Sequence, residues 1–297
     1  MARIVLAVIL SLTVSGCANW SNIFRAQNPE SNSSSLLKKS QMSDDSVVLE
    51  ISIIDIPLEQ RPKIESLFKT LDVTRIDLEQ RQAWDRNGLR VAAGGNAMPL
   101  EYEQILNSEI KEEEQAGESR DETKTAPRRR IQSRSGKPFR IATRSVSPEL
   151  TWFTINKDGY RQGASKHAAQ TEFEVRSYAQ GDGSIKLMIV PEIAYGESKQ
   201  VVTTSNASLR YEMKRDTVDF PGMRLEAVLH LGESLVMAAG TNENSSQGGQ
   251  PFFGLGKAFF GGEGDQCKIV VIRLAQSQRD DLFDSSQNSQ PLESVTE

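Results

Sequence analysis

The chain has little cysteine and little histidine. Its 297 residues include two cysteines, Cys17 and Cys267, and two histidines, His167 and His230. No Cys-x-x-Cys or His-x-x-x-His pattern occurs, so a zinc site lacks ligands. Neither histidine stands in the context of an activated nucleophile, and no Gly-x-Ser-x-Gly turn is present. The sequence therefore predicts no metal site, no cofactor and no nucleophile triad.

Long apolar runs and an excess of positive charge are also missing. After residues 4–14, no segment reaches the roughly 20 apolar residues that a membrane-spanning helix needs. The glycines at 94–95, 248–249 and 254–256 lack the following Lys-Ser/Thr of a phosphate loop. A net charge of -5 gives no reason to expect nucleic-acid binding. The 37% of hydrophobic residues nevertheless permits a folded core.

The N-terminus has the three parts of a secretory signal peptide. Arg3 supplies a positive charge, residues 4–14 form a short apolar run, and Ser15 and Gly16 are small. A charged start, an apolar core and a small-residue cleavage site define such a signal, which we place at residues 1–16.

The residues around the cleavage site, Val14-Ser15-Gly16-Cys17, resemble the lipobox of bacterial lipoproteins. The resemblance implies that Cys17 is lipidated and holds the protein on a membrane, because acyl chains bury enough methylene groups for a nearly permanent anchor. Ala18 follows instead of an aspartate, which in Gram-negative sorting favours the outer membrane, here facing the periplasm. A lipidated Cys17 leaves Cys267 without a disulfide partner. Because Cys267 adjoins an expected strand, we predict a buried, inert thiol.

The first part of the exported chain divides into a tether and a small domain. Residues 17–45 are polar and rich in serine and asparagine, which is typical of a flexible tether. Residues 46–110 are expected to form a small α+β domain, in which helices cover a small sheet. Periodicity predicts strands at 47–56 and 89–93 and helices at 59–71, 77–86 and 99–110.

Residues 111–137 differ in character, because an acidic stretch runs into a basic one. We interpret this block as a solvated, charged linker. Alternatively, its arginines contact the phosphates of a lipid or of a partner. These arginines are Arg128, Arg129, Arg130 and Arg134.

The remainder has the pattern of short strands joined by turns. Residues 138–274 alternate apolar and polar positions, with turn signals at 158–159, 181–183 and 232–233. A glycine-rich insertion occupies 240–264, and residues 275–297 have the composition of a disordered tail. The expected fold class is α+β, with a small α/β N-terminal domain followed by a mainly antiparallel β-sheet or sandwich. We expect strands at 151–155, 170–178, 185–190, 208–213, 224–230, 234–238 and 267–274.

Several motifs in this β module, taken in order, resemble the C-terminal module of bacterial secretins. That family forms the outer-membrane channels of type II and type III secretion systems. The resemblance implies a secretin-like β module that acts in binding or assembly, in association with secretion. The matching segments are a Gly-Asp-Gly turn at 181–183, a Pro-Glu-Ile signature at 191–193, a turn and strand at 232–240, an aromatic-glycine stretch at 251–260, a final apolar strand at 268–274 and an opening strand at 47–53.

Three functional hypotheses follow. In the first, a lipid-anchored envelope protein binds a protein partner or assembles with itself, using the aromatic-glycine stretch as its contact surface. The second is a secreted hydrolase or carbohydrate-acting enzyme, since paired carboxylates on one strand face suit acid–base work, although solvated alternation also explains them. The third is a purely structural lipoprotein. The absence of a catalytic constellation favours the first. The contact residues would be Phe252, Phe253, Phe259 and Phe260, and the candidate catalytic residues would be Glu172, Glu174, Glu192 and His230.

Overall fold

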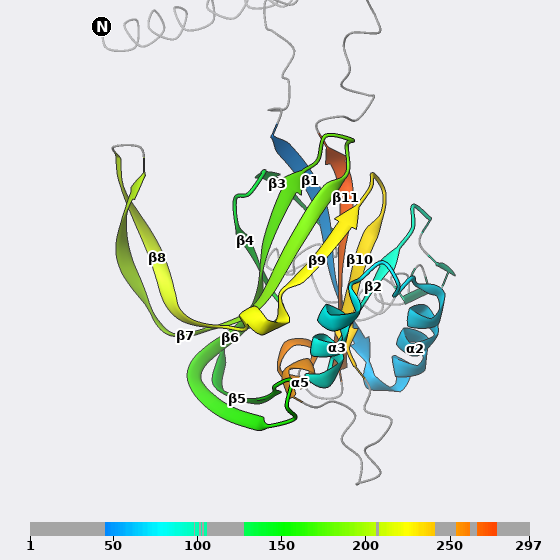
Figure 1. Ribbon diagram of the computed structural model, residues 1–297. Coiled ribbons are helices and arrows are strands. Elements are labelled where there is room, and N and C mark those ends of the chain that lie inside the picture. The colour runs from blue at the N-terminus through cyan, green and yellow to red at the C-terminus, as the bar shows by residue number, and fades with distance from the viewer. Residues whose placement is uncertain are drawn as a thin grey trace, which may run out of the picture. The chain divides into compact units, whose positions relative to one another are not determined.

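Alternating apolar and polar residues build two antiparallel sheets (Figure 1). In the first sheet the strand order is β2-β10-β11-β1-β3, and in the second it is β4-β6-β7-β8, with β5 paired to β6 and β9 to β7. The computed structural model describes residues 45–97, 99–100, 102, 104–105, 128–205, 208–240, 254–261 and 266–277. The expected α+β class, dominated by antiparallel sheet, is confirmed. The strands are β1 (Ser46–Pro57), β2 (Leu89–Gly94), β3 (Arg128–Arg134), β4 (Phe139–Ala142), β5 (Ser147–Ile155), β6 (Arg161–Ala179), β7 (Ile185–Ser205), β8 (Ser208–Asp219), β9 (Leu225–Leu229), β10 (Ser234–Ala239) and β11 (Gln266–Ser277).

The helices are short and follow local signals. Helix α3 (Leu78–Arg86) begins after Asp77, whose carboxylate accepts a hydrogen bond of 3.1 Å from the Gln80 N–H, and Gly88 with a φ of 73° follows its end. The helices predicted at 59–71 and 77–86 are confirmed. Within the third predicted helix, 99–110, residues 100, 102, 104 and 105 are helical. The helices and 3-10 turns are η1 (Leu58–Gln60), α2 (Arg61–Thr70), α3 (Leu78–Arg86), η2 (Pro221–Met223) and α5 (Gly254–Phe260).

The expected division into a domain at 46–110 and a module at 138–274 is wrong. β1 lies between β11 and β3, and β2 pairs with β10, so strands from both segments share one sheet. The described residues also share one core, where Trp84 stacks on Phe173 with 5.9 Å between ring centroids. The reason lies in β1, a strand of the buried core whose backbone N–H and C=O groups need a hydrogen-bonded strand along each edge, which β11 and β3 provide. Its buried apolar residues are Val47, Leu49, Ile51, Ile54 and Ile56.

The expected linker also contains a strand. β3 pairs with β1 from Ser46↔Arg134 to Ser52↔Arg128, so residues 128–134 belong to the first sheet. The arginines concealed the strand, because an edge position tolerates charged side chains on an extended backbone. Arg128 and Arg130 lie 3.7 and 3.9 Å from the Glu50 carboxylate. Contact of these arginines with phosphates stays a prediction.

Helix α5 corrects the expected contact surface. Phe259 and Phe260 are both 0% exposed, and their rings lie 5.0 and 5.8 Å from the Phe173 ring. They belong to the core, because the seven residues of α5 turn both aromatic side chains inward. The proposed contact surface is therefore wrong for these two residues. Phe252 and Phe253 lie outside the described residues.

Several sequence predictions concern parts of the chain that are not described. The signal peptide, Cys17 and the tether before residue 45 lie outside the described residues. β11 continues to Ser277, so the first three residues of the expected disordered tail are in a strand instead. Within the described part of the chain, no helix combines the length and apolar character needed to cross a membrane.

Candidate functional site: the β7–β8 hairpin and its charged root

The hairpin of β7 and β8 extends beyond its neighbours in the sheet. The register between the two strands shifts between Tyr195 and Lys199, and from Lys199 to Ser205 β7 pairs with β8 alone among the described strands. Figure 1 shows these two strands running on together past the ends of their neighbours. We call residues 199–214 the hairpin arm.

One face of the hairpin arm is apolar and exposed. Alternate residues of β8 share a face, and Leu209, Tyr211 and Met213 are 69%, 65% and 66% exposed. Val202, which is 52% exposed, lies opposite Tyr211 and therefore on the same face. Glu212 between them points to the other face. Such a group of exposed apolar side chains is typical of an interaction surface.

The outer edge of β8 is also unpaired. In the part of the chain that the structure describes, β8 pairs with β7 and with no other strand over its 12 residues. An unpaired edge presents a row of backbone N–H and C=O groups that can receive a further strand. The hairpin arm thus combines a backbone edge and an apolar face, which are the two components of strand-mediated association.

Arg215 fixes the inner end of the arm, where two strands bend. Its Nε donates to the Gly196 carbonyl at 3.0 Å, and its Nη1 lies 3.4 Å from the Gln170 amide oxygen. A third hydrogen bond runs from Nη2 to the Ala168 carbonyl. Gly196 has a φ of 73° and Ala168 a φ of 48°, so Arg215 holds the points at which β7 and β6 leave the extended conformation.

Three carboxylates lie in one line across the second sheet at the root of the arm. Glu172 on β6 is opposite Glu192 on β7, and Glu192 is opposite Asp219 on β8. Glu172 and Glu192 are only 9% and 4% exposed. The Arg140 Nε lies 3.0 Å from Glu192 and 3.3 Å from Glu172, and its Nη2 lies 3.6 Å from Glu174. We call Arg140, Glu172, Glu192 and Asp219 the root cluster.

Burial dominates the electrostatics of this cluster. Loss of hydration on burial raises the pKa of Glu172, and the nearby Arg140 offsets only part of this effect. Burial likewise raises the pKa of Glu192, against the opposing hydrogen bond from Arg140. The root cluster therefore holds two carboxylates that favour the protonated form more than free glutamate does.

The candidate catalytic residues do not form one site. Glu172, Glu174 and Glu192 gather around Arg140, whereas His230 lies in the turn between β9 and β10. There its Nδ1 is 3.1 Å from the Glu233 carboxylate, and no hydrogen bond or ion pair joins it to the glutamates among the described residues. Within the same residues, no group of three or more acidic, histidine or cysteine side chains is placed to hold a metal.

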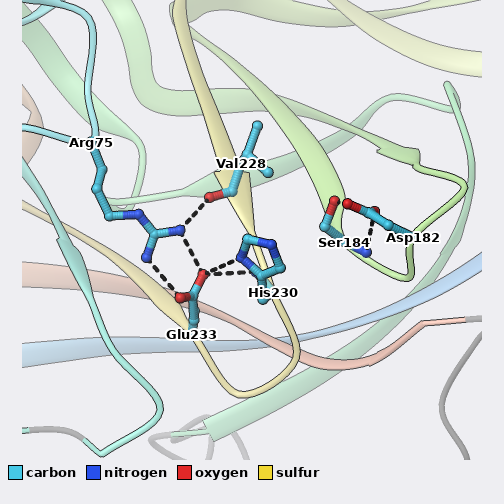
Figure 2. A network of polar contacts seen from close by, with 6 residues as sticks. All are labelled: Arg75, Asp182, Ser184, Val228, His230 and Glu233. Carbon is cyan, nitrogen blue, oxygen red and sulfur yellow. Dashed lines mark hydrogen bonds and ion pairs between the residues drawn. The ribbon is translucent and has the colours of Figure 1, made fainter.

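Figure 2 shows how Glu233 organises that turn. Arg75, from the segment between α2 and α3, donates to both Glu233 oxygens at 2.8 and 2.7 Å and to the Val228 carbonyl at 3.2 Å. The His230 backbone N–H donates to the same carboxylate at 2.8 Å. These hydrogen bonds lower the pKa of Glu233 to about 2, with that from Arg75 as the largest cause.

Replacing Glu233 by glutamine is expected to lower the free energy of unfolding by roughly 1–3 kcal/mol at neutral pH, because a charge-assisted pair becomes a weaker hydrogen bond. The lowered pKa means that the contribution of Glu233 is fully present above pH 4.5 and is lost as the pH falls through about 2. The difference between variant and wild type should shrink over the same range. Urea unfolding at several pH values measures it, with Glu212→Gln on the exposed arm as the control. An equal effect of both substitutions would contradict the role of the Arg75 pair.

Sequence reasoning identified part of these sites. It placed Glu172 and Glu174 on one strand face from their alternation and named Glu192 as a further candidate, but it missed Arg140, Arg215 and Arg75, whose partners are distant in sequence. The predicted burial of Cys267 is confirmed, since it is 1% exposed and its thiol lies 3.4 Å from the Ile56 carbonyl. Burial raises the pKa of that thiol to about 11.

Glycosidases place two carboxyl groups on either side of a scissile bond. Here the Arg140 guanidinium lies among the three glutamates, and Arg176 also binds Glu174, so the geometry favours a structural or electrostatic role for them over acid–base catalysis. The hairpin arm and the root cluster are therefore the best candidates for the functional site of the described residues. Comparison with protein-family models, with curated proteins and with solved structures found no match.

Proposed function

We propose that this protein is a lipid-anchored cell-envelope protein whose β module acts in assembly, with the hairpin arm joining a second copy of the chain. The observation that carries the proposal is the unpaired edge of β8 beside the exposed apolar face of Val202, Leu209, Tyr211 and Met213. A second copy can add backbone hydrogen bonds along that edge and cover the apolar face in one step.

Two resemblances in the sequence support the proposal. Val14-Ser15-Gly16-Cys17 is similar to a lipobox, which would bring copies together on one membrane surface. The order of motifs is similar to that of secretins, whose subunits assemble. Here the Pro-Glu-Ile signature lies on β7 at Pro191–Ile193, and the later turn and strand include β10.

If the chains are confined to a membrane, a contact of modest free energy is sufficient for their association. Burying a side chain such as Tyr211 or Met213 contributes roughly 1.5–3 kcal/mol relative to leaving it exposed. Association of free chains must also overcome the loss of translational and rotational freedom. An anchor at Cys17 would restrict each chain to a surface beforehand, so less of that loss would remain.

The test is the mass of the full chain, extracted from a bacterial envelope in detergent and examined by size-exclusion chromatography with light scattering. Wild type is expected to form a defined oligomer. Tyr211→Lys combined with Met213→Lys should weaken association at least about tenfold, since burial of two large side chains is lost. Glu212→Lys is the matched control, because it places the same residue on the same strand but on the other face.

Two outcomes would contradict the assembly proposal. One is a wild-type chain that stays monomeric at the highest concentration attainable. The other is an oligomer that the double variant and Glu212→Lys affect equally, which would place the interface elsewhere. Circular dichroism of each variant shows whether the fold itself is retained.

Labelling of cells with a palmitate analogue tests the anchor separately. Label is expected on wild type and on Cys267→Ala, but not on Cys17→Ala. Because Cys267 is buried and is the only other cysteine, its variant controls for non-specific acylation. Labelling that survives Cys17→Ala would overturn the anchor without affecting the assembly result.

A further inference from the structure

The root cluster occupies the place where the hairpin arm joins the rest of the sheet. Glu192 is the central member of the line, since it pairs with Glu172 on one side and with Asp219 on the other. On both sides a carboxylate therefore faces a carboxylate directly across neighbouring strands. Like charges in such directly opposed positions weaken strand pairing.

The compensating positive charge is limited and shared. Arg140 directs the same nitrogen, Nε, toward Glu192 at 3.0 Å and toward Glu172 at 3.3 Å. A guanidinium Nε carries one hydrogen, so one good hydrogen bond is available there for two carboxylates, and the geometry gives it to Glu192. Glu172 keeps an ion pair with Arg140 but no hydrogen bond from it among those of the described residues.

We propose that the root cluster is a protonation-dependent latch on the hairpin arm. Uptake of one proton, shared between Glu172 and Glu192, removes the opposed charges of these two carboxylates and tightens the pairing of β7 with β6. While the proton is on Glu192, it also removes the charge that faces Asp219 on β8. Loss of that proton restores the repulsion between Glu172 and Glu192 and loosens the arm at its root. The latch belongs to a single chain and does not require assembly.

The raised pKa of both glutamates gives the direction of the effect. For a carboxyl group whose pKa is raised by folding, the stabilisation is fully present below its ordinary value of 4.5 and is lost as the pH rises through the raised value. Because the two groups interact, they titrate as a pair and not independently. The arm should therefore be held more firmly at pH 4.5 than at pH 8.

Charged groups from every neighbouring strand take part in this balance. From β6, Glu174 adds negative charge near both glutamates, but Arg176 binds it at 2.8 Å. From β8, the positive charge of Arg215 lowers the pKa of Glu172, whereas the negative charge of Asp219 raises the pKa of Glu192. With all of them ionised, carboxylates outnumber guanidinium groups around the line by four to three. The carboxylates are Glu172, Glu174, Glu192 and Asp219, and the guanidinium groups are those of Arg140, Arg176 and Arg215.

Hydrogen exchange of the full chain, resolved by segment, tests the latch. The measured quantity is the protection of the arm relative to β11 in the same molecule, so that the intrinsic pH dependence of exchange cancels. Relative protection is expected to be about two- to fivefold higher at pH 4.5 than at pH 8, the range that opposed like charges provide. In Glu192→Gln the protection of the arm relative to β11 should equal, at both pH 4.5 and pH 8, the value that wild type shows at pH 4.5.

Further variants keep the proposal falsifiable. Glu172→Gln should reproduce the result if Glu192→Gln proves unstable, whereas Glu212→Gln, an exposed carboxylate on the arm, should behave as wild type. The measurement is repeated in Tyr211→Lys/Met213→Lys, in which any pH effect on assembly is removed. A relative protection that does not change with pH in that variant, or an equal change in Glu172→Gln, Glu192→Gln and wild type, would overturn the latch while leaving the assembly proposal intact.

Discussion

Replacing Gly256 by alanine is expected to destabilise the fold by about 3 kcal/mol or more, a larger effect than any surface substitution proposed above. A Cβ at Gly256 would lie 1.7 Å from the carbonyl oxygen of Gly88, which is backbone and cannot rotate away. The approach is fixed from both sides, since the Gly256 N–H donates to Asn87 O at 3.0 Å and the Gly240 N–H donates to Gly88 O at 2.8 Å.

A loss of stability in Gly256→Ala would show that the steric clash outweighs the higher helix propensity of alanine, whereas a gain would show the reverse. Gly256 lies inside α5, where alanine would ordinarily stabilise by about 1 kcal/mol. Urea unfolding followed by circular dichroism measures the net change. Gly181→Ala is the matched control, because a Cβ there has no atom within 4 Å and its effect should stay within about 0.5 kcal/mol. Equal stability of both variants would mean that α5 does not pack on the turn at Asn87 and Gly88.

Removing the Trp84 side chain is the second large perturbation, with an expected cost of about 3–5 kcal/mol. Trp84 is 0% exposed, its ring stacks on Phe173, and its indole N–H donates to the Met223 carbonyl at 2.7 Å. Trp84→Ala therefore leaves a cavity and an unsatisfied buried carbonyl. Tyr160→Ala, at a residue that is 75% exposed, removes a comparable aromatic side chain without either consequence.

Trp84→Ala also tests whether the segments before and after residue 128 unfold together. Trp84 comes from the first and Phe173 from the second, so the loss of their contact should lower a single transition for both. Tryptophan fluorescence and far-UV circular dichroism are expected to give coincident midpoints in wild type and in Tyr160→Ala. Separate midpoints, or an effect of Trp84→Ala on only part of the amplitude, would contradict a shared core.

Local periodicity predicted the elements that carry it strongly. The strand at 47–56 and the helices α2 and α3 follow from alternation, a cap at Asp77 and a glycine at Gly88. Strand β3 was not predicted, because four arginines gave it the composition of a linker. Helix α5 was not predicted, because seven residues are too few to show a helical period. β7 was predicted only to residue 190, since Pro191 follows there, and Gly196 with the polar residues after it gives no alternation from which to extend the strand.

What the sequence could not provide is the pairing between distant segments. A residue on β4 becomes the partner of Glu192 only through the register of three strands, and nothing near Arg140 in the sequence indicates this contact. The alternation of Glu172 and Glu174 indicated a shared face, but not that Glu192 lies opposite Glu172 or that Arg140 lies opposite Glu174. The hairpin arm was visible as a strand at 208–213, but its free edge is a property of the whole sheet.

The position of the two ends of the described unit has a mechanical consequence. Val47, near the start of β1, lies opposite Ser277, the last residue of β11. A force that pulls these two points apart acts across the strands at one end of the pair, so it opens the hydrogen bonds one after another, as in a zipper. The hairpin arm belongs to the second sheet, and no strand pair joins the two sheets among the described residues, so a force between residue 47 and the arm would be carried by the core that the sheets share.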